Sequence, residues 1–428
     1  MKKLSCAQCL DKIYKLGRFG IKLELDTISD ILYKLGNPEK KYLTIHIAGT
    51  NGKGSVASYL STILIKAGFK TGLYTSPHLI KFNERILINN QQILDEDIIK
   101  AYETVDAADT GKRKATFFEI ATAMSFYHFA KQNVDFAVIE TGMGGRFDAT
   151  NIIHPELSII TNIAIEHSEY LGKTIKNIAK EKSGIIKSKA PVITGVSQAS
   201  ALKVIKETAQ TKYSQVFVYK KDFSMRKNPT KNTYTYHGLE KKFLHLKNPL
   251  KGKHQKDNLS LSLAACEILF KKLKNKKCNQ NLIEQALLTT KWQGRLEYVQ
   301  KNPLVIIDGA HNLKAARTLS QHLKAEFKNI ILVIGILDDK PYEKILGCLV
   351  PCAKKIIITK AKNNRSLEPA VLQRSAKKIT RSSLSIIEDV QKAVKHAIKN
   401  AQKGEVVCIA GSLYVAGEAK TLFNKTII

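Results

Sequence analysis

Apolar and polar positions follow two different periods along most of the chain. Short runs rich in β-branched residues, such as LTIHIA at residues 43–48 and DFAVIE at residues 135–140, are typical of buried strands. Longer stretches with helical spacing stand between such runs, among them residues 53–67 and 115–132. Strands and helices in alternation predict an α/β fold, with a mostly parallel sheet covered by helices on both faces.

The same alternation starts afresh in the last third of the chain. Residues 252–273 predict a loop and a long helix, and residues 291–303 (KWQGRLEYVQKNP) predict a connector. Five further strands are then predicted, each followed by helical spacing: PLVIID, NIILVIG, KKIIIT, LSIIE and EVVCIAGS. We therefore expect two domains, a larger one over residues 1–296 and a smaller α/β domain over residues 297–428.

Composition and hydropathy exclude several classes of protein. Hydrophobic residues make up 44% of the 428 residues and charged residues 25%, which is ordinary for a folded globular chain. The longest apolar runs, such as residues 329–337, are shorter than the ~20 residues of a membrane span. The first residues lack the apolar core of a signal peptide. We therefore expect a cytoplasmic protein with no membrane partner.

The seven cysteines favour reduced thiols, because their number is odd and they are scattered along a long chain. Cys6 and Cys9 form a single C-x-x-C, and Cys348 and Cys352 lie far downstream at a different spacing. A zinc site needs a matched set of ligands. Small, mostly buried residues are therefore the favoured interpretation.

A strong positive charge is the one unusual property of the composition. The 69 Lys and Arg residues exceed the 37 Asp and Glu residues, for a formal net charge of +32. Such a charge attracts nucleic acid, but it also attracts ATP and carboxylates. The lysines are spread over nearly every segment and are not interleaved with aromatic residues that could stack on bases. We expect a monomer without a nucleic-acid partner, and a basic RNA-binding ATPase stays open as an alternative.

The stretch GTNGKGS at residues 49–55, here called the phosphate loop, stands between a predicted strand and a predicted helix. Such a helix N-terminus directs N–H groups and a positive dipole end at a phosphate. Lys53 can reach the outer phosphates, and Ser55 could face a magnesium ion, although Gly54 departs from the common G-x-x-x-x-G-K-[ST] spelling. The expected nucleotide contacts are Asn51, Gly52, Lys53, Gly54 and Ser55.

This loop resembles that of the folylpolyglutamate synthase and dihydrofolate synthase branch of the Mur-type amide ligases. Further motifs of that family follow in its order over nearly the whole chain: LYTSPHLIKFNERI, TFFEIATAMSF, IETGMGGRFDATN, NIAIEHSEYLG, IAKEKSGI, GKHQKDN, WQGRLE, DGAHN and GSLYVAGE. The resemblance implies an N-terminal domain that binds ATP and a pterin, and a C-terminal Rossmann-like glutamate ligase domain. The implied reaction is ATP-dependent attachment of L-glutamate to dihydropteroate and to reduced folates.

A ligase of this kind activates a carboxylate by phosphorylation, so its site needs hard oxygen ligands and cations. Glu140 ends a predicted strand at the sheet edge where α/β folds bind ligands, which makes it a candidate ligand for Mg²⁺. The resemblance adds Ser76 and His167 as magnesium ligands. It also implies that Lys182 is carbamylated, which turns a cation that would repel the metal into a supporting anion.

The resemblance also assigns residues in the second half of the chain. Asn258 is expected to hold the adenine, and Arg295 to reach the phosphates from the connector when the domains close. Asp308 and His311 follow a predicted strand and are implied in nucleotide and glutamate binding, and Ser412 is expected to face glutamate. The residues expected to be catalytic are Lys53, Lys182 and His311.

A pterin ring needs an aromatic contact and a hydrogen-bonding carboxylate, which Phe118 and Asp148 offer at positions that match the family's pocket. These two residues favour a bifunctional enzyme over a monofunctional folylpolyglutamate synthase, which stays an alternative. A purely structural place in the core is the competing interpretation of Phe118. A cell-wall Mur ligase is disfavoured, because only about 40 residues precede the first strand of the alternation, too few for a UDP-binding domain.

Overall fold

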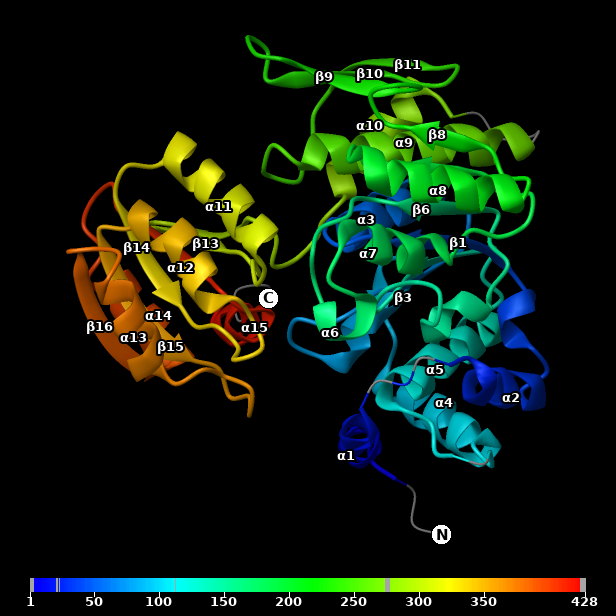
Figure 1. Ribbon diagram of the computed structural model, residues 1–428, viewed down its shortest axis with the longest axis horizontal. Coiled ribbons are helices and arrows are strands. Elements are labelled where there is room, and N and C mark those ends of the chain that lie inside the picture. Colours follow the sequence, from blue (N-terminus) through cyan, green and yellow to red (C-terminus); the bar gives the residue numbers. More distant parts are fainter. Residues whose placement is uncertain (1–3, 21, 23, 112, 274–277, 424–428) are drawn as a thin grey trace. The chain divides into compact units, whose positions relative to one another are not determined.

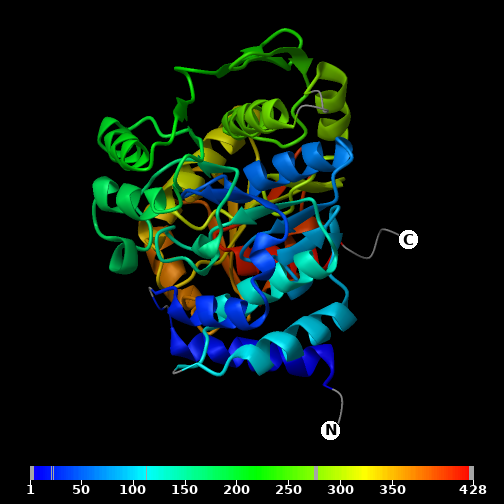
Figure 2. The same cartoon turned by 90° about the vertical axis from the view of Figure 1, so that its right-hand side faces the viewer.

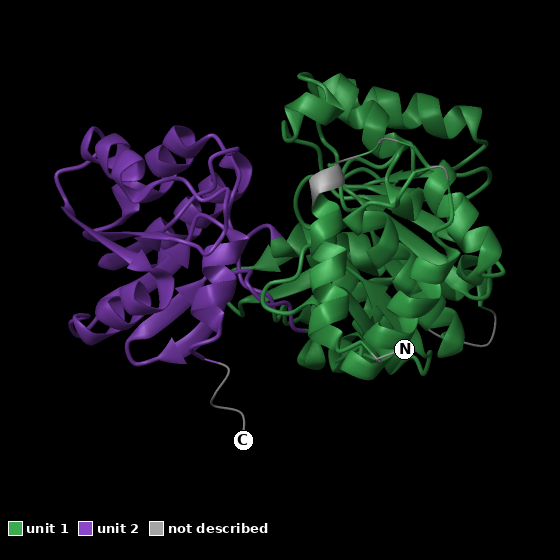
Figure 3. Cartoon of the chain, turned by 90° about the horizontal axis from the view of Figure 1, so that it is seen from below, with its two compact units in different colours: residues 1–249, 255–290 green, residues 250–254, 291–428 purple. Residues whose placement is uncertain are grey.

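The computed structural model describes residues 4–20, 22, 24–111, 113–273 and 278–423. The chain divides into two compact units, the first made of residues 1–249 and 255–290 and the second of residues 250–254 and 291–428 (Figure 3). The predicted boundary after residue 296 differs from this division, because the short segments 250–254 and 291–296 group with the second unit. Among the described helices, none is both long and apolar enough to cross a membrane.

The first unit is built on a mostly parallel sheet, as predicted. Its described strands lie in the order β4-β3-β2-β5-β1-β6-β7-β8. Six of them run parallel: β1 (Leu43–Ala48), β2 (Thr71–Tyr74), β5 (Phe136–Glu140), β6 (Leu157–Ile160), β7 (Val192–Thr194) and β8 (Val216–Val218). The antiparallel edge is formed by β3 (Ile86–Ile88) and β4 (Gln91–Gln92). The parallel strands are apolar and buried because helices cover both faces of the sheet.

One face of this sheet is covered by α3 (Lys53–Lys66), α9 (Gln255–Lys272) and α10 (Gln280–Thr289). The other face carries α5 (Phe117–Lys131), α7 (Ile175–Ser183) and α8 (Ala199–Thr211). Outside α5 lie α1 (Cys6–Lys15), α2 (Asp26–Lys34) and α4 (Asp95–Ala108), blue to cyan in Figure 2. A capping box of Thr116 and Glu119 fixes the start of α5.

A three-stranded antiparallel sheet of β9 (Ser224–Asn228), β10 (Thr233–His237) and β11 (Lys242–Leu246) lies beyond α9 and α10 (Figure 1). The sequence pattern did not predict it, because these short strands carry many polar residues. A carboxylate of α9 anchors this sheet to the helix. Glu267 accepts hydrogen bonds from the Tyr236 hydroxyl at 2.7 Å and from the backbone N–H groups of residues 239–241 at 2.8–3.1 Å.

The second unit is also an α/β unit, with described strands in the order β12-β13-β17-β14-β15-β16. Five of them run parallel: β13 (Leu304–Ile307), β14 (Ile330–Ile334), β15 (Lys355–Lys360), β16 (Ser383–Asp389) and β17 (Val406–Ala410). The five parallel strands are each followed by a helix: α11 (Leu313–Glu326), α12 (Tyr342–Leu349), α13 (Pro369–Lys377), α14 (Val390–Lys399) and α15 (Leu413–Lys420).

One part of the predicted connector is wrong. Residues Glu297–Lys301 form β12, an antiparallel edge strand that pairs with β13. The sequence EYVQK is mostly polar, and none of its residues is fully buried, so it lacks the apolar pattern that identifies an inner strand. Backbone pairing with its neighbour holds it in place.

Gly411, in the turn between β17 and α15, offers a test of this architecture. Its φ is +103°, and a Cβ there would lie 2.5 Å from the backbone oxygen of Gly335. Gly411→Ala is therefore expected to lower the free energy of unfolding by ~1–3 kcal/mol. The control is Gly347→Ala on the exposed side of α12, where nothing lies within 4 Å of the new Cβ. It is expected to raise stability by ~0.5–1 kcal/mol. Equal changes in urea denaturation midpoints would contradict the described turn.

Candidate active site

The predicted site residues of the first unit gather at the carboxyl edge of its sheet. The phosphate loop follows β1, Glu140 ends β5, and Ser76 follows β2, which lies on the far side of β5 from β1. The chain leaves β1 toward β2 and leaves β5 toward β6, so the strand order reverses at this point. Open α/β sheets bind their ligands at such a switch point.

The end of β6 clamps the phosphate loop. The Asn51 carbonyl accepts the Thr161 hydroxyl at 2.8 Å and the Asn162 amide at 2.7 Å, and the Asn51 N–H donates to Asn162 Oδ1 at 3.1 Å. A Cβ at Gly49 would lie 1.9 Å from Thr161 Oγ1, so only glycine fits there. Among the described residues no side chain caps the first turn of α3. Its N–H groups are therefore available to a phosphate.

Lys53 and Glu140 form the charged centre of this edge. Lys53 Nζ donates to the Gly49 carbonyl at 3.0 Å and lies 3.8 Å from Glu140 Oε1. The backbone N–H of Ser76 donates to the other oxygen of Glu140 at 3.3 Å. Ser76 thus lies next to the Glu140 carboxylate. Mg²⁺ commonly takes one or two carboxylates and completes its shell with phosphates and water.

His167, the third predicted magnesium ligand, lies on the exposed loop after β6 with a φ of +46°. Its part in binding metal stays a prediction. In the described part of the chain, no three or more His, Cys, Asp and Glu side chains are grouped as a metal site. All seven cysteines carry free thiols, as expected.

Lys182 is buried behind the phosphate loop, with 1% of its side chain exposed. Its ammonium donates to the Gly49 carbonyl at 3.0 Å and to Glu166 Oε1 at 2.9 Å. Burial lowers the pKa of Lys182, although Glu166 acts in the opposite direction. Burial alone would raise the pKa of Glu166, but Lys182 and Lys53 outweigh it and the net shift is downward. Sequence reasoning missed Glu166, whose only signal was its place before His167.

A polar chain connects the phosphate loop to α9. Gln255 Nε2 donates to the Ser55 hydroxyl at 3.2 Å, and Asn258 Nδ2 donates to Gln255 Oε1 at 2.9 Å. Gly52 lies against Asn258, since a Cβ there would be 2.4 Å from Asn258 Oδ1. The predicted adenine contact therefore lies beside the predicted phosphate contact. Sequence reasoning missed Gln255, because its hydrogen-bond partner Ser55 lies 200 residues away in the sequence.

Phe118, in the first turn of α5, lies against the loop after β5, and Asp148 belongs to that loop. A Cβ at Gly142 would lie 2.5 Å from Cζ of Phe118, so the ring is in direct contact with the loop after β5. Asp148 accepts the N–H of Met143 at 2.8 Å and both the N–H and the hydroxyl of Thr150 at 3.1 and 2.5 Å. Burial raises the pKa of Asp148. Phe118 is half-buried, so its ring is not confined to the core.

A cluster that sequence reasoning missed lies next to Phe118. The Phe117 ring stacks on Tyr14, with centroids 5.7 Å apart, and the Arg85 guanidinium lies 5.0 Å from the Phe117 centroid. Arg85 Nε donates to His78 Nδ1 at 2.8 Å. Burial, with a contribution from Arg85, lowers the pKa of His78 to about 3, so His78 is a neutral acceptor. Arg85 and His78 both belong to the LYTSPHLIKFNERI stretch.

In the second unit, the predicted residues follow the neighbouring strands β13 and β17. The Asp308 carboxylate accepts the N–H groups of Leu296 and Ala310 at 2.8 and 2.9 Å. Burial raises the pKa of Asp308, and Arg295 opposes this shift. His311 Nδ1 donates to the Gly309 carbonyl at 2.8 Å.

Arg295 lies against the same turn, because a Cβ at Gly309 would be 2.9 Å from its Nη1. Ser412 caps α15 and accepts the N–H of Tyr414 at 3.1 Å. Arg295, Asp308 and His311 are therefore brought together, and Ser412 follows the adjacent strand.

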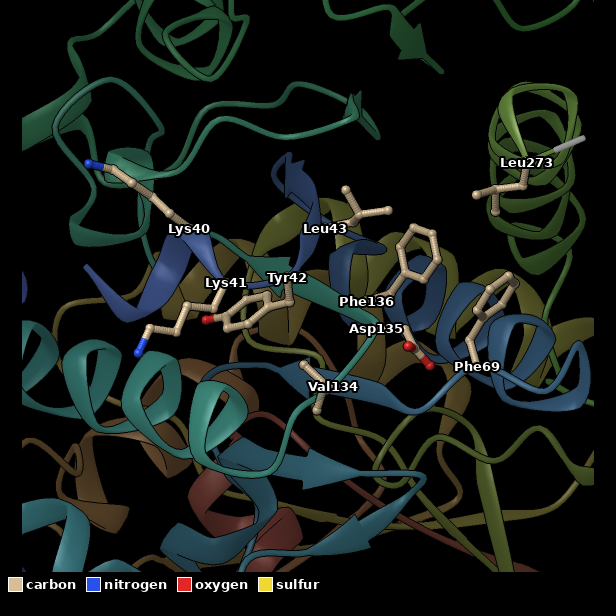
Figure 4. A pocket seen from close by; sticks show the side chains of 9 residues that line it. All are labelled: Lys40, Lys41, Tyr42, Leu43, Phe69, Val134, Asp135, Phe136 and Leu273. Carbon is tan, nitrogen blue, oxygen red and sulfur yellow. The ribbon is translucent and has the colours of Figure 1, made fainter. Parts of the chain in front are cut away.

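A surface hollow of about 430 Å³ lies elsewhere, at the amino ends of β1 and β5 (Figure 4). Its lining residues are Lys40, Lys41, Tyr42, Leu43, Phe69, Val134, Asp135, Phe136 and Leu273. None of the predicted site residues is among them. This edge of a parallel sheet is opposite the one where ligands bind.

The fold and the residues at the carboxyl edge of the first sheet define a Mur ligase. The Mur ligase middle domain matches residues 47–266, and the Mur ligase glutamate ligase domain matches residues 294–413. The chain is 36% identical over 415 residues to the dihydrofolate synthase/folylpolyglutamate synthase of Bacillus subtilis, covering 94% of this chain and 95% of that one. The chain therefore belongs to the dihydrofolate synthase/folylpolyglutamate synthase family.

Solved structures agree with this assignment. Folylpolyglutamate synthase from Thermotoga maritima is similar with a TM-score of 0.86 and 38% identity, covering 98% of this chain and 97% of that one. E. coli FolC in complex with DHPP and ADP is similar with a TM-score of 0.89 and 26% identity, covering 99% of this chain and 98% of that one.

The buried pair of Lys182 and Glu166 generates a prediction. Lys182→Met leaves a carboxylate in the interior without its cation, which is expected to lower the free energy of unfolding by ~3 kcal/mol. The double variant Lys182→Met/Glu166→Gln removes both charges and is expected to recover more than half of that loss. Urea denaturation of the four proteins of the cycle measures the coupling. If Lys182→Met has the same effect in the Glu166→Gln background as in the wild type, the two charges do not stabilise each other.

Proposed function

We propose that the chain is a bifunctional ATP-dependent ligase, which uses Mg²⁺ and joins L-glutamate to dihydropteroate and to reduced folates. The observation that carries this proposal is the position of Lys53, between the Gly49 carbonyl and the Glu140 carboxylate at the uncapped start of α3. In a chain of this family, that position is suited to receive the outer phosphates of ATP beside a metal ligand.

The first step is transfer of the γ-phosphoryl group. A free carboxylate is a poor acceptor for an amine, because its charge repels the nucleophile and oxide is a poor leaving group. One carboxylate oxygen of the folate precursor attacks the γ-phosphorus, the bond to ADP breaks, and an acyl phosphate forms. Lys53 and the N–H groups of α3 neutralise charge on the phosphoryl oxygens. Bound Mg²⁺, held by Glu140 and Ser76 with His167, would supply further positive charge there.

The second step joins glutamate to the activated acceptor. The amine of glutamate attacks the acyl carbon, a tetrahedral intermediate forms, and phosphate leaves with the bridging oxygen while the amine loses a proton. We assign glutamate binding to His311 and Ser412, and nucleotide contacts to Asn258, Arg295 and Asp308. His311 donates Nδ1–H to the Gly309 carbonyl, which orients the ring.

Activity toward dihydropteroate is the finer part of the proposal. Phe118 offers an aromatic face beside the Gly142 backbone, and Asp148 is a fixed carboxylate in the same loop. Both residues would contact the pterin ring, which dihydropteroate and the reduced folates share. The printed name of the Bacillus subtilis relative includes both activities, and the E. coli structure contains DHPP together with ADP. A monofunctional folylpolyglutamate synthase is the alternative.

The assay that separates these two functions measures ADP release with ATP, Mg²⁺, glutamate and either acceptor. We expect turnover with dihydropteroate and with tetrahydrofolate. Lys53→Ala is expected to lower both rates at least ~100-fold, because charge on the transferred phosphoryl group loses its nearest cation. The control is Lys66→Ala at the exposed end of the same helix, which should keep wild-type rates. Turnover with tetrahydrofolate alone would exclude the bifunctional assignment, and full activity of Lys53→Ala would exclude the proposed site.

We further propose that Lys182, whose unmodified ammonium pairs with Glu166, is carbamylated in the working enzyme. Its neutral amine attacks carbon dioxide, an N–C bond forms as one C–O π bond breaks, and the nitrogen gives a proton to water, which leaves a carbamate anion. Burial lowers the pKa of Lys182 and so favours the neutral amine that reacts. With ¹³C-bicarbonate, ATP and Mg²⁺, we expect a carbamate resonance in the ¹³C NMR spectrum of the wild type and none for Lys182→Arg. Identical spectra for the two proteins would rule the modification out.

A further inference from the structure

A buried chain of three side chains runs from the first strand to the loop after β5. His46 lies in the middle of β1 and is fully buried, and its Nε2 is 2.8 Å from the Thr150 hydroxyl. Thr150, also fully buried, donates that hydroxyl to Asp148 Oδ1 at 2.5 Å and its N–H to the same oxygen at 3.1 Å. Asp148 and Thr150 are neighbours in one sequence motif, whereas His46 lies 104 residues before Thr150, and only the fold brings it to the other two.

The direction of each hydrogen bond in this chain follows from its neighbours. The Thr150 hydroxyl has one hydrogen and gives it to Asp148, so it can only accept from His46. His46 therefore carries its hydrogen on Nε2. Burial, with a contribution from Lys187, lowers the pKa of His46 to about 3, so the ring is neutral over the physiological range. His46 Nδ1 has no hydrogen-bond partner among the described residues, so the ring makes its polar contact through Nε2 alone.

The chain fixes one oxygen of Asp148, and the backbone fixes the other. Oδ1 is held by Thr150, and Oδ2 accepts the N–H of Met143 at 2.8 Å. Asp148 is 6% exposed, so its carboxylate has little freedom to turn. Burial raises the pKa of Asp148, and the positive charge of Lys53 in the phosphate loop acts in the opposite direction. The carboxylate is thus held in one orientation next to the charged centre of the site.

This chain connects β1 to the loop after β5. His46 is three residues before Gly49, where the phosphate loop begins, and His46 pairs in register with Ile139, next to Glu140. A rigid strand supports a side chain more accurately than a loop can, and buried hydrogen-bond networks that are satisfied tend to fix one conformation.

We propose that His46 and Thr150 are positioning residues, which orient the Asp148 carboxylate for the acceptor substrate of the ligase. This inference rests on the proposed function, in which Asp148 contacts the pterin ring. A role limited to supporting the fold would affect stability, but it would not separate the two substrates.

The test compares KM for dihydropteroate with KM for ATP in four variants. Thr150→Val keeps the shape of the side chain and removes the hydroxyl, and Thr150→Ser keeps the hydroxyl and is the matched control. Thr150→Val and His46→Leu are expected to raise KM for dihydropteroate about tenfold, with KM for ATP within about twofold of the wild type, since one buried hydrogen bond is lost. Thr150→Ser should stay near the wild type. The double variant His46→Leu/Thr150→Val should be no worse than Thr150→Val alone, because both changes break the same chain.

Asp148→Asn separates failure of this inference from failure of the proposed function. If Asp148→Asn leaves KM for dihydropteroate unchanged, Asp148 does not contact the acceptor and both claims about it are wrong. If Asp148→Asn raises that KM and Thr150→Val does not, the positioning role is wrong while the contact stands. If Thr150→Val lowers the Tm and raises both KM values equally, the chain supports the fold alone and the inference is overturned. A change confined to KM for dihydropteroate at a Tm near that of the wild type supports it.

Discussion

The ammonium of Lys53 has to remain close to a carboxylate, a carbonyl and the start of a helix, and the rest of the first unit can be understood from that requirement. The carbonyl of Gly49 lies 3.0 Å away and Glu140 3.8 Å away. Both are held by parallel strands that end at one edge, so their separation is set by the sheet. Thr161 and Asn162 hold the loop from the other side. A phosphoryl group entering this edge meets groups that are already oriented, which is the condition for electrostatic catalysis.

Lys182, Asp148 and Asp308 carry buried charged groups, and each of these groups has an ion-pair or hydrogen-bond partner nearby. Lys182 is paired with Glu166, and Asp148 accepts three hydrogen bonds. In the second unit, the Asp308 carboxylate is bonded to two backbone N–H groups, one of them on the segment that carries Arg295. Asp308 therefore ties that segment to the end of β13 in addition to any contact with nucleotide. Buried charges need such partners because leaving one unpaired is costly.

Local features of this structure could be predicted from the sequence, and features that depend on distant contacts could not. The α/β class, the strand before the phosphate loop and the position of Glu140 follow from short patterns. The edge strand β12 and the sheet β9–β11 were missed because their residues are mostly polar and their pairing is decided by neighbours. Glu166 and the link from His46 to Asp148 were missed for a related reason, since each joins segments that are separated in the sequence. Motif spelling predicted which positions form the site, and it carried no information on which atoms bond.

The central claim is that the acceptor carboxylate is phosphorylated before glutamate is attached. Dihydropteroate labelled with ¹⁸O in both carboxylate oxygens tests it directly, because an acyl phosphate gives up its bridging oxygen when phosphate leaves. Mass spectrometry of the phosphate released in one turnover should show one ¹⁸O atom per phosphate, with the other ¹⁸O retained in the amide product. Phosphate that contains no ¹⁸O, formed at the same rate as the amide, would contradict the account.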